Sequence, residues 1–166
     1  CILRVIKALW RNGYVHRDIK PENIIKHKSQ ERPFVVLDLG IAFCVRDTAL
    51  TYDPASRLPP ATYRYIAPEM LRPNFRETID YRSDLYSAAL TVYEYAAKCH
   101  ALARDSDDLM ATLGRALAQP AVPLEKHRPG LAGSVLCRYV NDLLRKQPAL
   151  RPARIDSIIN ELEIGL

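Results

Sequence analysis

One segment, residues 16–23 (HRDIKPEN), groups the side chains best suited to chemistry. It places a carboxylate at Asp18, an amine at Lys20 and an amide at Asn23. Such a carboxylate can orient a hydroxyl and accept its proton, and the nearby ammonium steadies the charge of a transferring phosphoryl group. The amide oxygen of Asn23 and the carboxylate of Asp38 are hard oxygen ligands of the kind that Mg²⁺ prefers. These residues therefore suit transfer of a phosphoryl group to a hydroxyl.

The elements around these residues are predicted from hydrophobic periodicity. Apolar side chains recur at helical spacing over residues 2–10, and Asn12-Gly13 ends that pattern. Residues 34–37 (FVVL) predict a buried strand that closes in a turn at residues 38–40. Residues 44–61 contain several prolines and no period, which predicts an exposed loop.

The remainder of the chain is predicted to be helical. Ser83-Asp84 is expected to cap a buried core helix, which lies within the apolar stretch 85–103. Further helices are predicted at residues 105–118, 131–146 and 153–162, with prolines between them. The pattern indicates one α+β domain, mainly helical, with small β-hairpins near one end.

Composition narrows the possible functions. The 166 residues are 48% hydrophobic and 26% charged, which is ordinary for a globular domain. The net charge of +5 comes from scattered residues, so we expect no nucleic-acid partner. The apolar stretch contains Glu94, Lys98 and His100, which argues against a transmembrane segment. The four cysteines lie far apart and predict neither a zinc site nor a disulfide framework, but a reducing, cytoplasmic location.

Five segments, in the same order, resemble the motifs of eukaryotic-type protein kinases. Residues 16–23 resemble the catalytic loop, and Asp38-Leu39-Gly40 resembles the metal-binding turn with Leu in place of Phe. Ala67-Pro68-Glu69 resembles the motif that closes the activation segment. Residues 83–87 are similar to the start of the family's central helix, and residues 143–152 to the stretch before its last helix.

The resemblance implies a protein kinase-like fold in which residues 1–166 form the C-terminal lobe. The catalytic loop would be residues 16–23, the activation segment 38–69 and the helical subdomain 81–163. The sequence has no glycine-rich phosphate loop and no Val-Ala-Ile-Lys strand, so the N-terminal lobe is absent from it and is an expected partner in cis. The chain alone is therefore expected to be inactive.

The resemblance also implies roles for individual residues, with ATP and Mg²⁺ as cofactors. The expected catalytic residues are Asp18, Lys20 and Thr62; the expected cofactor-binding residues are Lys20, Asn23, Ile25 and Asp38; the expected metal ligands are Asn23 and Asp38. Lys20 points to a protein substrate with a serine or threonine acceptor. Ile25 is expected beneath the adenine ring.

Other residues are expected to support this machinery. His16 is expected to pack and hydrogen-bond beside the metal turn rather than to catalyse. Arg17 marks kinases whose activation segment is phosphorylated, and its guanidinium would meet that phosphate. The candidate phosphorylation sites are Thr48, Thr51, Tyr52 and Ser56.

One pair of residues and one single residue have expected structural roles. Glu69 and Arg151 are expected to form a buried ion pair. Asp84 is expected to accept backbone hydrogen bonds from the catalytic loop.

Three alternatives remain beside a serine/threonine protein kinase. A small-molecule kinase of related fold would lack Lys20, the long activation segment and residues 67–69, all of which are present. A pseudokinase scaffold is disfavoured by the intact Asp18, Lys20, Asn23 and Asp38. A free-standing helical interaction module would bind peptides without ATP.

Overall fold

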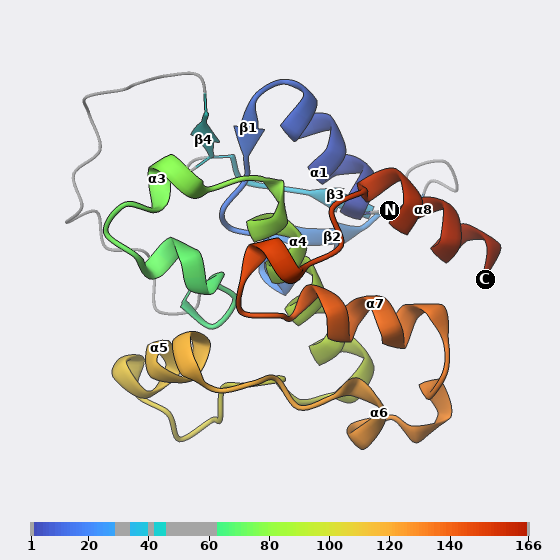
Figure 1. Cartoon of the computed structure of the whole chain (residues 1–166). Helices are drawn as coiled ribbons and strands as arrows, with labels where there is room; N and C mark the ends of the chain where they lie inside the picture. Colours follow the sequence, from blue (N-terminus) through green and yellow to red (C-terminus); the bar gives the residue numbers. More distant parts are fainter. Residues whose placement is uncertain (1, 29–33, 40–41, 46–62, 166) are drawn as a thin grey trace.

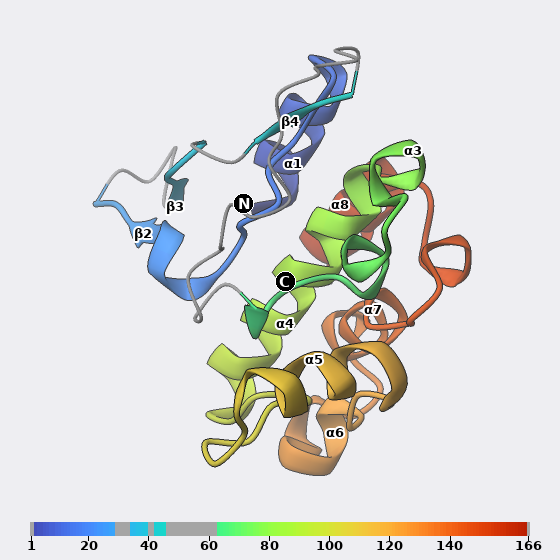
Figure 2. The same ribbon diagram turned by 90° about the vertical axis from the view of Figure 1, so that its left-hand side faces the viewer.

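A computed structural model describes residues 2–28, 34–39, 42–45 and 63–165 of the chain. Helices dominate, and the short strands come early in the chain, which confirms the predicted mainly helical α+β fold (Figure 1). In chain order the elements are α1 (Ile2–Arg11), β1 (Tyr14–Val15), the 3₁₀ helix η1 (Pro21–Asn23), β2 (Ile24–Lys26), β3 (Phe34–Val36), β4 (Phe43–Cys44), η2 (Pro68–Leu71), α3 (Phe75–Thr78), α4 (Tyr81–Ala97), α5 (Leu109–Ala118), α6 (Leu124–His127), η3 (Pro129–Leu131), α7 (Val135–Leu143), η4 (Pro148–Leu150) and α8 (Ile155–Ile164). The strands lie on one side of the molecule and α5, α6 and α7 on the other, with α4 between them (Figure 2).

Helix α4 forms the centre of the molecule. Asp80 caps its N-terminus, because its carboxylate accepts a hydrogen bond from the backbone N–H of Arg82 at 2.7 Å. The prediction that Ser83 and Asp84 form the cap was wrong: both are buried inside the first turn, and their side chains bond to other elements. The helix ends before Lys98, which adopts the left-handed conformation (φ 60°).

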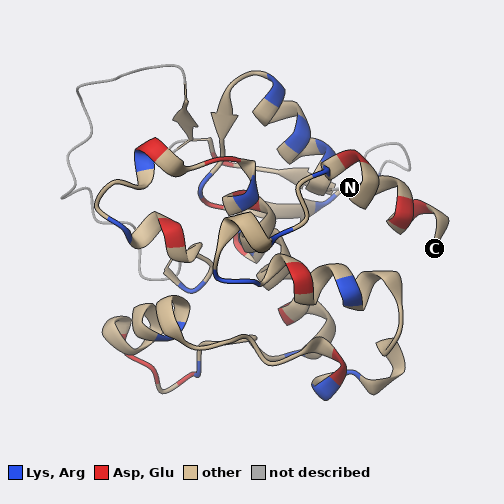
Figure 3. Cartoon of the chain, viewed as in Figure 1, with Lys and Arg blue, Asp and Glu red and all other residues tan. Residues whose placement is uncertain are grey.

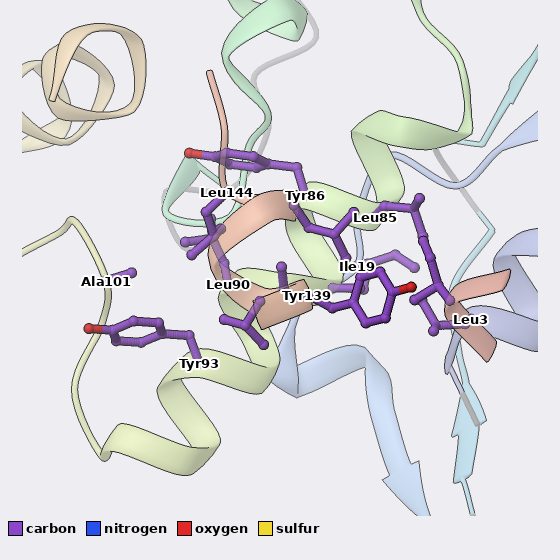
Figure 4. Packing of buried hydrophobic residues seen from close by; sticks show 14 of the residues in the cluster. Leu3, Ile19, Leu85, Tyr86, Leu90, Tyr93, Ala101, Tyr139 and Leu144 are labelled. Atoms are coloured by element: carbon purple, nitrogen blue, oxygen red, sulfur yellow. The ribbon is translucent and has the colours of Figure 1, made fainter. Parts of the chain in front are cut away.

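The hydrophobic core surrounds α4. Leu85, Tyr86 and Leu90 extend from α4 and are fully buried, and they share one core cluster with the buried side chains of Tyr139 of α7 and Leu144 just beyond it (Figure 4). Complete burial of a leucine or phenylalanine side chain contributes about 1.5–3 kcal/mol. A helix that is apolar on most of its faces must be covered on most of its faces, which explains its central position.

In the described parts of the chain, four short strands form two separate antiparallel pairs. β1 pairs with β4, with Val15 opposite Phe43, and β2 pairs with β3, with Ile25 opposite Val35. Only β2 and β3 are consecutive, so that pair is the predicted hairpin. The prediction that residues 34–37 form a buried strand was wrong about burial, because Val35 and its neighbours Phe34 and Leu37 are 38–46% exposed. β3 contacts α1, but a single helix can cover only one face of the two-stranded sheet, so the other face stays exposed.

Capping side chains decide where the later helices begin. The predicted helix 105–118 begins only at Leu109, because the carboxylate of Asp108 accepts the N–H of Ala111 at 2.7 Å. The predicted helix 131–146 begins only at Val135, since Ser134 caps α7. Among the described ranges, no helix combines the length and the apolar character needed to cross a membrane.

A buried ion pair joins segments that are far apart in the sequence. The guanidinium of Arg151 makes two parallel bonds to the carboxylate of Glu69, with Nη1–Oε1 at 2.7 Å and Nη2–Oε2 at 2.8 Å. The hydroxyl of Ser83 donates to the same Oε1 at 2.6 Å, and the guanidinium lies 4.7 Å from the ring centroid of Tyr86. Both ionic side chains are at least 96% buried, so the predicted pair is confirmed and links η2, α4 and η4.

The residues after α4 are held by a partly buried histidine. Nδ1 of His100 accepts hydrogen bonds from the backbone N–H groups of Leu102 at 3.1 Å and Ala103 at 2.8 Å. The imidazole lies edge-on to Tyr65, with the ring centroids 5.5 Å apart. Burial lowers the pKa of His100 to about 4. Because Nδ1 must accept both bonds, the neutral ring is the form that this turn requires.

We predict that Arg151→Met destabilises the protein by about 3–5 kcal/mol, because it leaves the carboxylate of Glu69 buried without its partner. Urea unfolding of the variant and the parent measures this difference. Arg145→Met is the control, since the side chain of Arg145 makes only a half-exposed pair with Asp142. Equal stability of the Arg151 and Arg145 variants would contradict the role of the ion pair.

We predict that His100 makes the protein less stable as the pH falls from about 6.5 to about 4. In this range the unfolded chain binds a proton at His100 that the folded chain does not, so the free energy of unfolding rises with pH. Across this pH range the contribution of His100 to the free energy of unfolding falls by about 3 kcal/mol, since one pKa unit corresponds to about 1.4 kcal/mol. Urea unfolding at several pH values measures how steeply the free energy of unfolding rises with pH. This rise should be shallower for His100→Asn than for His27→Asn, which changes an exposed histidine. Identical slopes would contradict this assignment.

Candidate active site

The segment 16–23 is anchored by the buried carboxylate of Asp84. Its Oδ2 accepts the backbone N–H of His16 at 2.8 Å, and its Oδ1 accepts the backbone N–H of Arg17 at 2.9 Å. Burial raises the pKa of Asp84 to about 7, and the two N–H donors oppose that rise. Arg17 has φ 68°, a left-handed conformation that non-glycine residues rarely adopt. The predicted role of Asp84 is confirmed: it holds a locally strained turn in place.

His16 connects this turn to the strand that precedes Asp38. Its ring is completely buried, Nδ1 accepts the backbone N–H of Asp18 at 3.3 Å, and Nε2 lies 3.1 Å from the carbonyl oxygen of Leu37. Since Nδ1 accepts, Nε2 carries the proton and donates to that carbonyl. Burial lowers the pKa of His16, which favours this neutral form. The prediction that His16 packs and hydrogen-bonds beside residue 38 is confirmed.

Asp18 lies at the centre of the site, and its two carboxylate oxygens have different surroundings. Oδ2 accepts hydrogen bonds from Nζ of Lys20 and from Nδ2 of Asn23, both at 2.8 Å. The same amide nitrogen of Asn23 donates to the backbone oxygen of Asp18, also at 2.8 Å. Oδ1 is buried and has no hydrogen-bond partner among the residues that the structure describes. One oxygen is thus fixed by a cation and an amide, and the other remains as an acceptor.

Asn23 and Asp38 lie at the junction of η1 and the β2–β3 hairpin. The backbone N–H of Leu37 donates to the carbonyl oxygen of Asn23 at 2.7 Å, which brings the end of β3 to the end of η1. Asp38 follows directly, is exposed and has φ 63°, a left-handed conformation that is common in turns, and a turn was predicted for residues 38–40. Gly40, the last residue of that turn, lies outside the described residues. The tertiary fold thus places Asp38 beside the segment that holds Asp18.

Of the other residues predicted to act at the site, some lie in the described parts of the chain and some lie outside them. Ile25 is in β2 and is 48% exposed, so it is an apolar side chain on the open surface of the hairpin. The predicted catalytic residue Thr62 lies outside the described residues, as do the candidate phosphorylation sites Thr48, Thr51, Tyr52 and Ser56. The guanidinium of Arg17, expected to meet a phosphate, lies over the ring of Phe43 at 5.5 Å.

The structure adds Tyr65 and Glu94, for which the sequence analysis predicted no role. The hydroxyl of Tyr65 donates to the carboxylate of Glu94, and the carbonyl oxygen of Tyr65 accepts a hydrogen bond from the hydroxyl of Ser87 at 2.8 Å. These bonds fasten the residues before η2 to α4. A signal was present in the sequence, because Glu94 is an isolated acid in an apolar helix and such a residue usually has a specific partner.

Solved structures with this fold include kinases. The chain aligns with the structure titled "Crystal structure of Rad53 kinase domain and SCD2" with a TM-score of 0.69 and 19% identity, over 99% of this chain and 53% of that chain. A second Rad53 structure, in complex with AMPPNP, gives a TM-score of 0.68 over 99% of this chain and 56% of that one. At 19% identity this likeness concerns the fold.

The sequence relatives among curated proteins include bacterial kinases. The chain is 35% identical over 130 residues to the probable serine/threonine-protein kinase PknB of Bifidobacterium longum, covering 78% of this chain and 18% of that protein. It is 33% identical over 159 residues to serine/threonine-protein kinase pkn3 of Myxococcus xanthus, covering 91% and 27%. It is 31% identical over 150 residues to PknD of Mycobacterium tuberculosis, covering 90% and 21%.

The chain spans only about a fifth to a quarter of these relatives' length. The protein kinase domain family, in contrast, matches residues 1–161, which is nearly the whole chain. The ordered motifs, the anchored segment 16–23 and this match agree, and the chain belongs to the protein kinase domain family.

Proposed function

We propose that the protein containing this chain is a serine/threonine protein kinase that transfers the γ-phosphoryl group of ATP to hydroxyls of protein substrates. The observation that carries the proposal is the asymmetric environment of Asp18, with Oδ2 fixed by Lys20 and Asn23 and Oδ1 buried without a described partner. The three bacterial relatives described above are all serine/threonine-protein kinases, which supports the proposal.

Asp18 and Lys20 have separate roles in this reaction. The free oxygen of Asp18 accepts a hydrogen bond from the substrate hydroxyl and orients its oxygen toward the γ-phosphorus. As the new P–O bond forms and the bond to the ADP oxygen breaks, the hydroxyl proton passes to Asp18. Lys20 balances the charge of Asp18 in the free protein and that of the transferring group during the reaction. Thr62 is proposed to contact the same residues from the acceptor side.

Asn23 and Asp38 are the proposed ligands of Mg²⁺. The amide nitrogen of Asn23 is committed to Asp18, so its carbonyl oxygen is the atom that suits a metal. Asp38 contributes a carboxylate from the adjoining turn, and this all-oxygen donor set fits Mg²⁺. When bound, the metal would neutralise the charge of the nucleotide phosphates.

The exposed apolar surface of the β2–β3 hairpin suits an adenine ring and an N-terminal lobe in cis. Ile25, Phe34 and Val35 are each 38–48% exposed there, an unusual density of apolar surface for two short strands. We propose that Ile25 packs beneath the adenine and that the lobe supplies the remaining phosphate contacts, so the chain alone is inactive. We place the protein in the cytoplasm, where its described cysteines would stay free.

We predict that Asp18→Asn in the full-length protein lowers kcat by at least about 100-fold, because the amide cannot accept the hydroxyl proton. Transfer of labelled γ-phosphate to a serine peptide, beside a binding assay for Mg-ATP, measures this effect. Asp142→Asn on α7 makes the same charge change far from the site and should retain activity. Undiminished transfer by Asp18→Asn would exclude Asp18 as the base. A parent protein with neither transfer nor ATP binding would favour a scaffold.

We predict that Asn23→Ala raises the Mg²⁺ concentration needed for half-maximal activity, because it removes one metal ligand. Asn23→Asp retains an oxygen ligand but loses the N–H that holds Asp18, so it should lower kcat with a smaller change in the Mg²⁺ requirement. Titration of the activity with Mg²⁺ separates the two effects. Asn12→Ala, on the surface at the end of α1, is the control. Parallel Mg²⁺ curves for all three variants would exclude Asn23 as a ligand.

A further inference from the structure

The turn that carries Asp38 is attached to the segment 16–23 on both of its sides. On the near side, the backbone N–H of Leu37 donates to the carbonyl oxygen of Asn23 at 2.7 Å, and the carbonyl oxygen of Leu37 lies 3.1 Å from Nε2 of His16. On the far side, β4 pairs with β1, and β1 directly precedes the segment. Two separate attachments therefore hold this turn against the segment.

The second attachment places Phe43 beside Arg17. Val15 lies opposite Phe43 in the β1–β4 pair, and the backbone N–H of Val45 donates to the carbonyl oxygen of Gly13 at 2.8 Å, which extends the pairing. Arg17 follows β1 closely, and its guanidinium lies over the ring of Phe43, with Cζ 5.5 Å from the ring centroid. This distance is within the range of a cation–π contact.

The contact between Arg17 and Phe43 lies largely away from water. Arg17 is only 7% exposed, and Phe43 is half-buried. A cation–π contact is stronger when its cation is desolvated. The residues of β1 and β4 carry no charge, as the tan colour of both strands in Figure 3 shows, so this pair offers the guanidinium an aromatic face rather than a carboxylate.

Arg17 needs support from its surroundings because its backbone is strained. Its φ of 68° is left-handed, a conformation that non-glycine residues rarely adopt. Asp84 holds this turn through two backbone N–H groups, and Phe43 contacts it through the side chain of Arg17. Asp18 is the next residue, so the two contacts act on the backbone from which its carboxylate extends.

We propose that Phe43 is a positioning residue for phosphoryl transfer: its ring holds the guanidinium of Arg17, keeps the strained turn closed and so orients Asp18. The inference rests on the proposed kinase function, because that function gives Asp18 its role. Phe43 acts through Arg17 and not on the substrate. Since β4 also follows the turn with Asp38, loss of the ring loosens both carboxylates. The ring belongs to the chain itself, so this support requires no phosphorylated residue.

Fluorinated phenylalanines at position 43 of the full-length protein test the contribution of the ring. Added fluorines withdraw negative charge from the face of the ring and change its shape little, so they weaken a cation–π contact. In protein treated with a phosphatase, we expect the initial kcat for a serine peptide to fall stepwise with one, two and three fluorines. The fall should reach about threefold to tenfold for the trifluorinated ring. Space filling alone would not respond in this way, and equal kcat for all the rings overturns the proposal.

Standard substitutions give a second test. Phe43→Leu removes the ring and should lower kcat about tenfold and raise the Mg²⁺ concentration needed for half-maximal activity, with the KM for the peptide unchanged. Phe43→Tyr keeps the aromatic face and should restore most of the activity. Tyr14→Leu is the matched control, because Tyr14 is the other aromatic residue of the β1–β4 pair and is 41% exposed. An equal loss for Tyr14→Leu and Phe43→Leu would assign the effect to the strand pair and overturn the role of the ring.

A double-mutant cycle shows whether Phe43 acts through Arg17. Arg17→Met removes the guanidinium and keeps most of the aliphatic stem. If the two side chains act as one unit, Phe43→Leu should lower kcat no further in a protein that already carries Arg17→Met. Effects of the two substitutions that multiply would show independent action, which contradicts the proposal.

Hydrogen exchange separates failure of this inference from failure of the proposed function. The backbone N–H groups of His16 and Arg17, which donate to Asp84, report on the turn without catalysis. Phe43→Leu should speed their exchange at least about threefold, and Tyr14→Leu should not. If the protein phosphorylates no peptide but shows this difference, the positioning role is supported and the kinase function is not. Unchanged exchange in Phe43→Leu overturns the positioning role, whatever the activity.

Discussion

The arrangement of the site depends on one buried carboxylate. Asp84 lies in the first turn of the central helix α4 and accepts the backbone N–H groups of His16 and Arg17, which are far from it in sequence. Burying a carboxylate is costly, and the two donors repay part of that cost. In return the strained turn at Arg17 is held against the central helix α4, and the orientation of Asp18 follows from it.

The ion pair of Glu69 and Arg151 extends this organisation to the other side of α4. Ser83, one residue before Asp84, donates to Glu69, so adjacent positions of one helical turn hold the site on one side and η2 on the other. Tyr86 stacks beneath the guanidinium of Arg151 one turn later. Ser83 and Asp84, in the first turn of α4, are therefore not caps. They are the contacts through which the helix positions segments from both ends of the chain.

The two flanks of α4 differ in how completely they are covered. On the flank of α7 the apolar side chains are buried or partly buried, and they belong to one core cluster with those of α4. On the flank of the strands the β2–β3 hairpin exposes large apolar residues, and the turn with Asp38 lies at its edge. Rigid packing on one flank and open apolar surface on the other suit a lobe that supplies catalytic groups to a ligand bound at its edge.

The sequence by itself determined the elements whose signals are local. The 3.6-residue period, the prolines and the ordered motifs predicted the helices, the hairpin and the family, and the residue types of the segment 16–23 predicted its chemistry. Only the tertiary structure decided which oxygen of Asp18 is held, that Asp80 rather than Ser83 caps α4, and that β3 is exposed. Each of these depends on what lies across space from the residue, which local periodicity does not encode.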